Sequence, residues 1–113
     1  MTRDDRARAE TADYAELVLE LADSIPAGRV MSYGDIAACL ETGGPRQVGR
    51  VMALWGGAVP WWRVVHADGS FLRGHEPEAL ARYTAERTPL RRAPDGAPLR
   101  VDMSRARWLP DPD

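Results

Sequence analysis

The sequence predicts a mainly helical α/β domain built on a winged helix-turn-helix, followed by an extended C-terminal tail. Two helical patterns, one opening at Ser32 and one at Pro45, are joined by the helix-breaking turn Thr42-Gly43-Gly44, as in a helix-turn-helix. Behind them, two short apolar runs within residues 64–72 flank an Asp-Gly pair, which is a strong signal for the hairpin of a wing. With 113 residues the chain has room for one core, so we expect one domain over 11–87.

The composition is that of an ordinary globular protein, with 44% hydrophobic and 28% charged residues. No apolar run approaches the roughly 20 residues that a membrane span needs, and the first six residues do not resemble a signal peptide. One cysteine, Cys39, excludes an internal disulfide and suits the cytoplasm. With His66 and His75 as the two histidines, which we expect to be solvated or capping residues, neither a structural zinc site nor another cofactor is expected.

Charge is distributed unevenly along the chain. The net charge of −2 argues weakly against a general polyanion binder. Residues 44–75, however, hold four arginines against one acid, whereas residues 1–24 hold three arginines against seven acids. All 15 basic residues are arginines, whose planar guanidinium suits phosphates and base edges. The positive stretch coincides with the second helix of the helix-turn-helix and the residues after it.

Before the helix-turn-helix, the pattern predicts one long helix and a short strand. Residues 1–10 alternate charges without an apolar face, so we expect them to fray. From about Ala12 to Ser24, apolar residues recur at helical spacing and acids occupy the outer face. The inner residues are Tyr14, Leu17, Val18, Leu21 and Ala22. Pro26-Ala27-Gly28 ends this helix with a turn, and Arg29-Val30-Met31 is expected to form a small strand.

The first helix of the pair has a complete N-terminal signal. Ser32 is placed to cap it, and Asp35 is the reciprocal partner three residues later. The inner face is formed by Ile36, Ala37 and Leu40. Cys39 lies beside them in mid-helix. We expect it to be a small packing residue rather than a nucleophile, because free cysteine is among the most buried residue types.

The second helix combines an apolar stripe with a basic outer face. Pro45 fits its first turn, where the missing N–H would be unpaired in any case. The stripe at i, i+3, i+4 and i+7 consists of Val48, Val51, Met52 and Trp55. Arg46, Arg50 and the small Ala53 fall on the opposite side. These arginines either contact DNA, as the recognition helix of a helix-turn-helix does, or only solvate a surface helix.

A last helix and a tail complete the chain. The helix runs over about 77–87, with Leu80 and Tyr83 pointing inward. Over residues 88–113, prolines and charges predict an extended tail that packs on the domain or flanks it. Its expected anchors are Val101, Met103 and Trp108. No sustained heptad pattern suggests a dimerisation helix, so we expect a monomer.

Three motifs resemble those of a known family. Residues 25–37 read I-P-A-G-R-V-M-S-Y-G-D-I-A, residues 46–49 read R-Q-V-G, and residues 60–65 read P-W-W-R-V-V. In order and spacing they resemble the I-P-x-G-x-V-x-[ST]-Y-G-x-I-A, R-x-V-G and P-C-H-R-V-[IV] motifs of the active-site domain of O6-alkylguanine-DNA alkyltransferases. The resemblance covers about residues 12–87. It implies that family's winged helix-turn-helix fold and a double-stranded DNA partner.

The chain departs from that pattern at the catalytic positions. Trp61 stands where the family has its nucleophilic Cys, and Trp62 where it has the His that activates the thiol. An indole forms no thiolate and accepts no alkyl group, so we expect no alkyltransferase activity. The chain therefore resembles the alkyltransferase-like proteins, in which Trp commonly replaces the Cys. That resemblance implies a non-enzymatic sensor that binds O6-alkylguanine in duplex DNA from the minor groove, flips the base and flags it for nucleotide excision repair proteins.

The resemblance also implies roles for single residues. Arg46 corresponds to the arginine that enters the duplex in place of the flipped base, and Tyr33 to the tyrosine that helps rotate the nucleotide's phosphate. The other predicted DNA contacts are Gln47, Arg50 and Arg29. The predicted lesion pocket consists of Tyr33, Trp61, Trp62, Val64 and the lid residue Arg73. For Tyr33 and Trp62, a place in the core is the alternative. The asparagine that links recognition helix and active site in the family has no counterpart in Gly56-Gly57-Ala58.

Other classes of function stay open at this point. A winged-helix transcriptional regulator would read the major groove with Arg46 and Arg50 and would use the pair Trp61-Trp62 as core. An enzyme would use Cys39 as an alternative nucleophile. A binder of RNA or protein partners is a further option, because replacement of both the Cys and the His exceeds the usual departure from the family. For a sensor or a regulator alike, we expect a cytoplasmic protein associated with the nucleoid.

Overall fold

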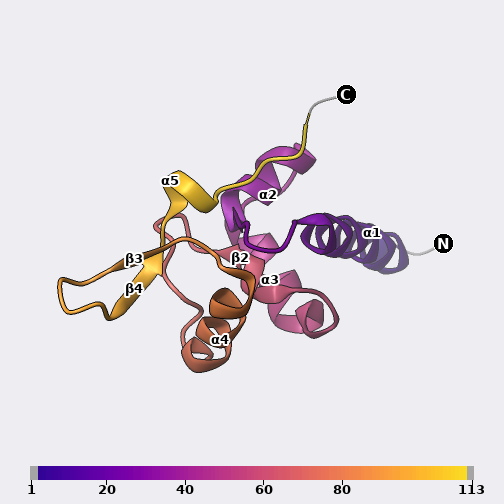
Figure 1. The fold of residues 1–113 in the computed structure, drawn as a ribbon. Coiled ribbons are helices and arrows are strands. Elements are labelled where there is room, and N and C mark those ends of the chain that lie inside the picture. The colour runs from indigo at the N-terminus through magenta and orange to yellow at the C-terminus, as the bar shows by residue number, and fades with distance from the viewer. Residues whose placement is uncertain (1–2, 112–113) are drawn as a thin grey trace.

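The protein is mainly helical, with two small sheets. The structure, a computed structural model, describes residues 3–111, and the side chains from Asp13 onward (Figure 1). The helices are α1 (Arg3–Ser24), α2 (Tyr33–Leu40), α3 (Pro45–Trp55), α4 (Glu76–Glu86) and α5 (Met103–Ala106), with two 3₁₀ turns, η1 (Gly56–Ala58) and η2 (Trp61–Arg63). The strands are β1 (Met31–Ser32), β2 (Val64–Val65), β3 (Leu90–Arg92) and β4 (Pro98–Val101). This content confirms the predicted mainly helical α/β class.

Helix α1 is longer than the sequence pattern predicted. It begins at Arg3, whereas we expected residues 1–10 to fray and the helix to start near Ala12. Residues 1 and 2 lie outside the described part of the chain. On the inner face Ala15, Val18 and Ala22 are buried, but Leu17 is 47% exposed, so the predicted stripe is narrower than expected.

The α2–α3 pair is the predicted helix-turn-helix. Ser32 Oγ accepts the backbone N–H of Asp35 at 3.0 Å, and Asp35 Oδ2 accepts that of Ser32 at 3.1 Å, which confirms the capping box. The Tyr14 hydroxyl donates to the carbonyl of Thr42 at 3.2 Å and so ties α1 to the turn between the two helices. Cys39 is exposed, and its prediction as a packing residue was wrong. It lies beside the buried stripe of α2 rather than within it.

Helix α3 buries the first part of its predicted stripe. Val48 and Val51 are buried and Met52 is half-buried, while Trp55 is 48% exposed. Trp55 was therefore wrongly placed on the inner face. It is the last residue of α3, and Gly56, which starts η1, is buried in contact with the Met52 side chain instead.

The predicted wing does not form within residues 64–72. Strand β2 pairs in parallel with β1, with Met31 opposite Val64 and Ser32 opposite Val65. The Asp-Gly turn is present, because Gly69 has a φ of +84° and its N–H donates to the carbonyl of His66 at 2.8 Å. Beyond that turn the chain crosses the end of β4 rather than returning along β2. Two buried valines suit the interior position that pairing with β1 gives them.

The C-terminal region is folded rather than extended. Strands β3 and β4 form an antiparallel hairpin that projects from the helices (Figure 1), and Arg91 lies directly opposite Arg100. The segment after α5 returns to the body, where the N–H of Trp108 donates to the carbonyl of Val30 at 2.8 Å. The predicted anchors do pack on the domain, with Val101 fully buried and Met103 and Trp108 half-buried.

The core consists of two adjoining groups of side chains. One joins the inner faces of α1, α2 and α3 to Met31 and Val64. The other gathers Val30, Val65, Ala79, Tyr83, Val101 and Ala106. Helix α4 thus buries Ala79 and Tyr83, whereas the predicted inner residue Leu80 is half-buried. No helix of the described residues combines the length and apolar character needed to cross a bilayer.

Candidate nucleic-acid interface

The outer face of α3 carries a row of arginines and small residues. Arg46, Arg50 and Ala53 are exposed, and Gly49 lies among them at helical spacing. Gln47 is exposed too, but its Oε1 accepts the N–H of Gly44 at 3.0 Å and so caps the helix. The N-terminal end of this face is therefore basic, while the part that follows is small enough for another backbone to approach.

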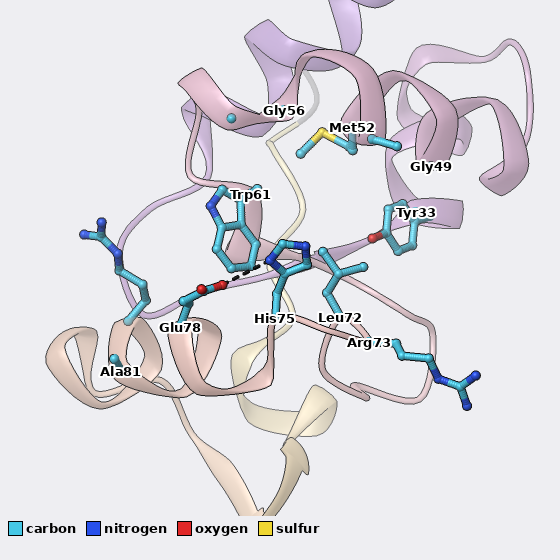
Figure 2. Close-up of a pocket in the computed structure, with 13 residues that line it drawn as sticks. Tyr33, Gly49, Met52, Gly56, Trp61, Leu72, Arg73, His75, Glu78 and Ala81 are labelled. Carbon is cyan, nitrogen blue, oxygen red and sulfur yellow. Dashed lines mark hydrogen bonds and ion pairs between the residues drawn. The ribbon is translucent and has the colours of Figure 1, made fainter.

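A cleft of about 790 Å³ opens between α3 and α4, within the range of roughly 300–1,000 Å³ usual for small-molecule sites. Its α3 wall continues the row of Arg46 through Gly49 and Ala53. Figure 2 shows Trp61 and Tyr33 on opposite sides of the space, with His75 and Leu72 between them. The complete lining is Tyr33, Gly49, Met52, Ala53, Gly56, Gly57, Trp61, Leu72, Arg73, His75, Glu78, Ala81 and Arg82.

Trp61 and Trp62 leave η2 in different directions. The two rings meet edge to face with centroids 5.7 Å apart. Trp61 lines the cleft, whereas Trp62 Nε1 donates to Glu86 Oε1 at 3.0 Å and the Arg82 guanidinium lies 4.5 Å from the centre of the Trp62 ring. The Trp62 carbonyl accepts the Tyr83 hydroxyl at 2.6 Å. Trp62 is therefore half-buried behind the cleft wall and not part of its lining.

Glu86 fixes the position of η2. Its carboxylate accepts Nε of Arg63 at 3.1 Å and Nη2 at 2.5 Å, as well as the N–H of Gly28 at 3.1 Å. Arg63 Nη1 also donates to the carbonyl of Ile25 at 2.8 Å. Burial by itself would raise the pKa of Glu86, but the hydrogen bonds from Arg63, Gly28 and Trp62 hold it below its ordinary value. The turn that carries Trp61 is thus bonded to α4 and to the loop after α1.

Tyr33 supplies a protonated hydroxyl at the other side of the cleft. Its ring lies 5.2 Å from that of His66, and its hydroxyl is directed toward the open space in Figure 2. Burial raises the pKa of Tyr33 above its ordinary value of 10.0, so the group remains a hydrogen-bond donor at neutral pH.

The profile of the family described as 6-O-methylguanine DNA methyltransferase, DNA binding domain, matches residues 13–87. The chain belongs to this family. No curated protein matches the sequence significantly.

Two solved structures share the fold of this methyltransferase-family chain. One is S. pombe Atl1 in complex with damaged DNA containing O6-carboxymethylguanine, and the other is S. pombe ATL in complex with DNA. Each solved chain is 24% identical to this chain, with a TM-score of 0.73. Each match covers 88% of this chain and 97% of the solved chain. At this identity the likeness shows the fold, including the helix-turn-helix.

Three of the predicted pocket residues of this methyltransferase-family chain line the cleft, and two do not. Tyr33, Trp61 and Arg73 are part of the lining. Trp62 faces Glu86, and Val64 is only 3% exposed in β2, so neither side chain lines this cleft. Val64 pairs with β1, and Trp62 packs against α4. For Trp62, the core alternative is closer to its observed place.

Of the predicted DNA contacts, Tyr33 alone reaches the cleft. Arg46, Gln47 and Arg50 lie on the exposed face of α3 that leads into it. Arg29 is exposed elsewhere and donates from Nη2 to the carbonyl of Arg107 at 2.8 Å. Arg73 lines the rim, but its guanidinium points away from the centre of the cleft in Figure 2.

Sequence reasoning missed a polar pair in the cleft of this family member. His75 Nδ1 lies 3.0 Å from Glu78 Oε2, and the His75 ring is 5.6 Å from that of Trp61. The spacing of three residues in a helix start was a usable signal, but the predicted hairpin placed His75 beside a wing instead. Within the described residues, no group of three or more His, Cys, Asp or Glu side chains could hold a metal ion.

Proposed function

We propose that the protein is a non-enzymatic sensor of O6-alkylguanine in duplex DNA, which binds from the minor groove and flips the modified base into the α3–α4 cleft. The position of Trp61 carries this proposal. Its indole lies on the cleft wall, at the motif position where the alkyltransferases that the chain resembles have their nucleophilic Cys.

The chemistry of the cleft supports binding without alkyl transfer. Transfer to sulfur needs a thiolate in line with the alkyl carbon, and an indole supplies none. Cys39 is the one cysteine of the chain, is exposed on α2 and does not line the cleft. An enzyme acting through Cys39 therefore has no geometric support.

The face of α3 fits a DNA duplex at close range. Arg46 stands at the start of the helix, one turn before Gly49, which lines the cleft. A guanidinium entering the base stack there would occupy the space of a nucleotide extruded toward the cleft. Arg50, on the same face, would contact phosphates, and Arg29 would extend these contacts from the loop after α1.

The cleft offers an aromatic surface for the extruded base. Extrusion costs a few kcal/mol, and stacking on an aromatic side chain returns about 1–3 kcal/mol per base. Trp61 supplies that surface, and the Tyr33 hydroxyl is directed into the same space. Because no in-line attack has to be met, an open cleft of this kind would tolerate bulky alkyl groups.

A cellular role follows from lesion binding without alkyl transfer. The S. pombe structure with O6-carboxymethylguanine supports a role for the shared fold in binding alkylated DNA. With no group for removing the lesion, the protein would act by flagging it for nucleotide excision repair proteins. A cytoplasmic monomer associated with the nucleoid would meet its substrate directly. The regulator alternative uses the pair Trp61-Trp62 as core, whereas Trp61 lines the cleft.

The test is binding of a short duplex with one O6-methylguanine against its unmodified twin, at one fixed moderate salt concentration. We expect tighter binding of the lesion duplex, loss of that preference in Arg46→Ala and Trp61→Ala, and unchanged protein mass by mass spectrometry. Arg105→Ala is the matched control, since Arg105 is exposed on α5 and does not line the cleft. Equal affinity of the wild-type protein for both duplexes would refute the proposal, and an added alkyl mass would refute its non-enzymatic part.

A further inference from the structure

The His75–Glu78 pair stands in the cleft without a role in base stacking. His75 Nδ1 is 3.0 Å from Glu78 Oε2, so the Nδ1 proton is directed to the carboxylate. Figure 2 shows the imidazole between Trp61 and Leu72, with its other nitrogen, Nε2, turned toward the open space below Met52. The carboxylate therefore orients the ring and leaves Nε2 available to a bound group.

The surroundings of Nε2 favour a base over a phosphate. Glu78 places a carboxylate against the imidazole, whereas the Arg73 guanidinium points away from the centre of the cleft and that of Arg82 lies over the Trp62 ring. The nearest charge to the ring is therefore negative, which disfavours a phosphate at this point. The adjacent Trp61 ring, 5.6 Å from the imidazole between centroids, is an apolar stacking surface. A planar ligand with polar atoms on its edge fits this combination.

We propose that His75 is a specificity determinant, which hydrogen-bonds through Nε2 to the Watson–Crick edge of the extruded purine; this inference rests on the proposed function. Alkylation at O6 removes the N1 proton of guanine and turns N1 from a donor into an acceptor. With Nδ1 bonded to Glu78, Nε2 donates when the ring carries both protons. A donating Nε2 matches O6-alkylguanine and meets the N1–H of guanine as a second donor.

Several charged or titratable side chains surround the His75 imidazole. The charged and titratable groups around the imidazole are Glu78 and Arg82 from α4, Arg73 from the preceding segment and Tyr33 from α2. The α3 wall contributes Gly49, Met52 and Ala53, none of which titrates. Glu78 is the group bonded to the ring, and its negative charge balances the imidazolium form in which Nε2 donates.

The test measures the ratio of affinities for the lesion and unmodified duplexes, because this ratio cancels the phosphate contacts that both share. His75→Phe keeps a ring beside Trp61 but removes both nitrogens. We expect it to lower the ratio about tenfold. Glu78→Gln keeps an acceptor for Nδ1 while removing the charge, and is expected to lower the ratio less than His75→Phe does. Arg105→Ala should retain the wild-type ratio.

The outcomes separate this inference from the function on which it rests. A wild-type ratio near one would overturn the proposed function and the inference together. A wild-type preference that His75→Phe retains within about twofold would overturn the inference alone. Both replaced side chains are exposed, so the variants are expected to fold, and thermal melts identify any loss of structure.

Discussion

Replacing Glu86 by Ala tests whether one carboxylate holds the turn that carries Trp61. The substitution removes the acceptor of hydrogen bonds from Arg63, Trp62 and Gly28. The Arg63 and Glu86 side chains are only 17% and 13% exposed, so the guanidinium would keep little access to water. Breaking a buried ion pair from one side costs about 3–5 kcal/mol. Because these side chains keep some exposure, we expect the lower end, about 3 kcal/mol.

The assay is thermal and urea unfolding of Glu86→Ala and Glu86→Gln beside wild type. At about 4 °C per kcal/mol for a domain of this size, the Ala variant should melt about 12 °C lower. Glu86→Gln keeps one acceptor oxygen and should lose about 1–2 kcal/mol. Glu20→Gln, at an exposed position on α1, should change stability by less than about 0.5 kcal/mol. A loss below about 1 kcal/mol in Glu86→Ala would refute the reasoning and place the pair with ordinary surface ion pairs.

The pH dependence of the same variants gives an independent check. The pKa of Glu86 is lowered in the folded protein, so its stabilising contribution is present above the ordinary value of 4.5 and is lost as the pH falls through the folded-state pKa. The stability gap between wild type and Glu86→Gln should therefore be full at pH 6 and should narrow below pH 4.5. A gap that stays constant down to acidic pH would contradict an ionised Glu86 in the network.

Two further predictions concern the turn at Gly69 and the basic face of α3. Gly69→Ala should lose more than about 2 kcal/mol in urea unfolding, because φ is +84° and a Cβ there would collide with the backbone carbonyl of Val101. Gly57→Ala, with open space around it, is the control, and equal stability of the two variants would contradict this prediction. Arg50→Ala should weaken binding of lesion and unmodified duplexes alike and lower the salt slope by about one. A selective loss of lesion binding would instead place Arg50 at the base.

Local signals were sufficient for the helix-turn-helix. The capping box at Ser32 and the first-turn proline of α3 act within a few residues, and both appear where the sequence placed them. The sheets depended on distant partners. The dipeptide Asp-Gly occurs at 68–69 and at 95–96, and only the second closes a hairpin. Before the first Asp-Gly dipeptide, Val64 and Val65 pair with β1, a two-residue strand that precedes the helix-turn-helix in the chain. No local sequence pattern predicts that pairing.

The candidate site also combines residues that local sequence patterns predict with residues whose positions depend on distant partners. Arg46 and Arg50 were predicted from helical spacing, and they lie on the exposed face of α3 that leads into the cleft. Tyr33 and Trp61 were predicted from the family motifs, and both line the cleft. Their roles in DNA binding stay predictions. Trp62 was misplaced because its direction depends on Glu86, a partner on another helix. His75 and Glu78 were missed because their place in the cleft depends on how α4 packs.

The second core group is complete only when the last part of the chain has been synthesised, because it includes Val101 and Ala106. Val30, which precedes β1, and Val65, the last residue of β2, share that group with Val101 and Ala106. The carbonyl of Val30 also accepts its hydrogen bond from the N–H of Trp108, near the end of the described chain. Helices α2 and α3 therefore leave the ribosome before the residues that cover β1 and β2 have been synthesised. A nascent chain that ends before β4 would leave Val30 and Val65 without the cover of Val101 and Ala106, while the helix that carries Arg46 and Arg50 is already complete.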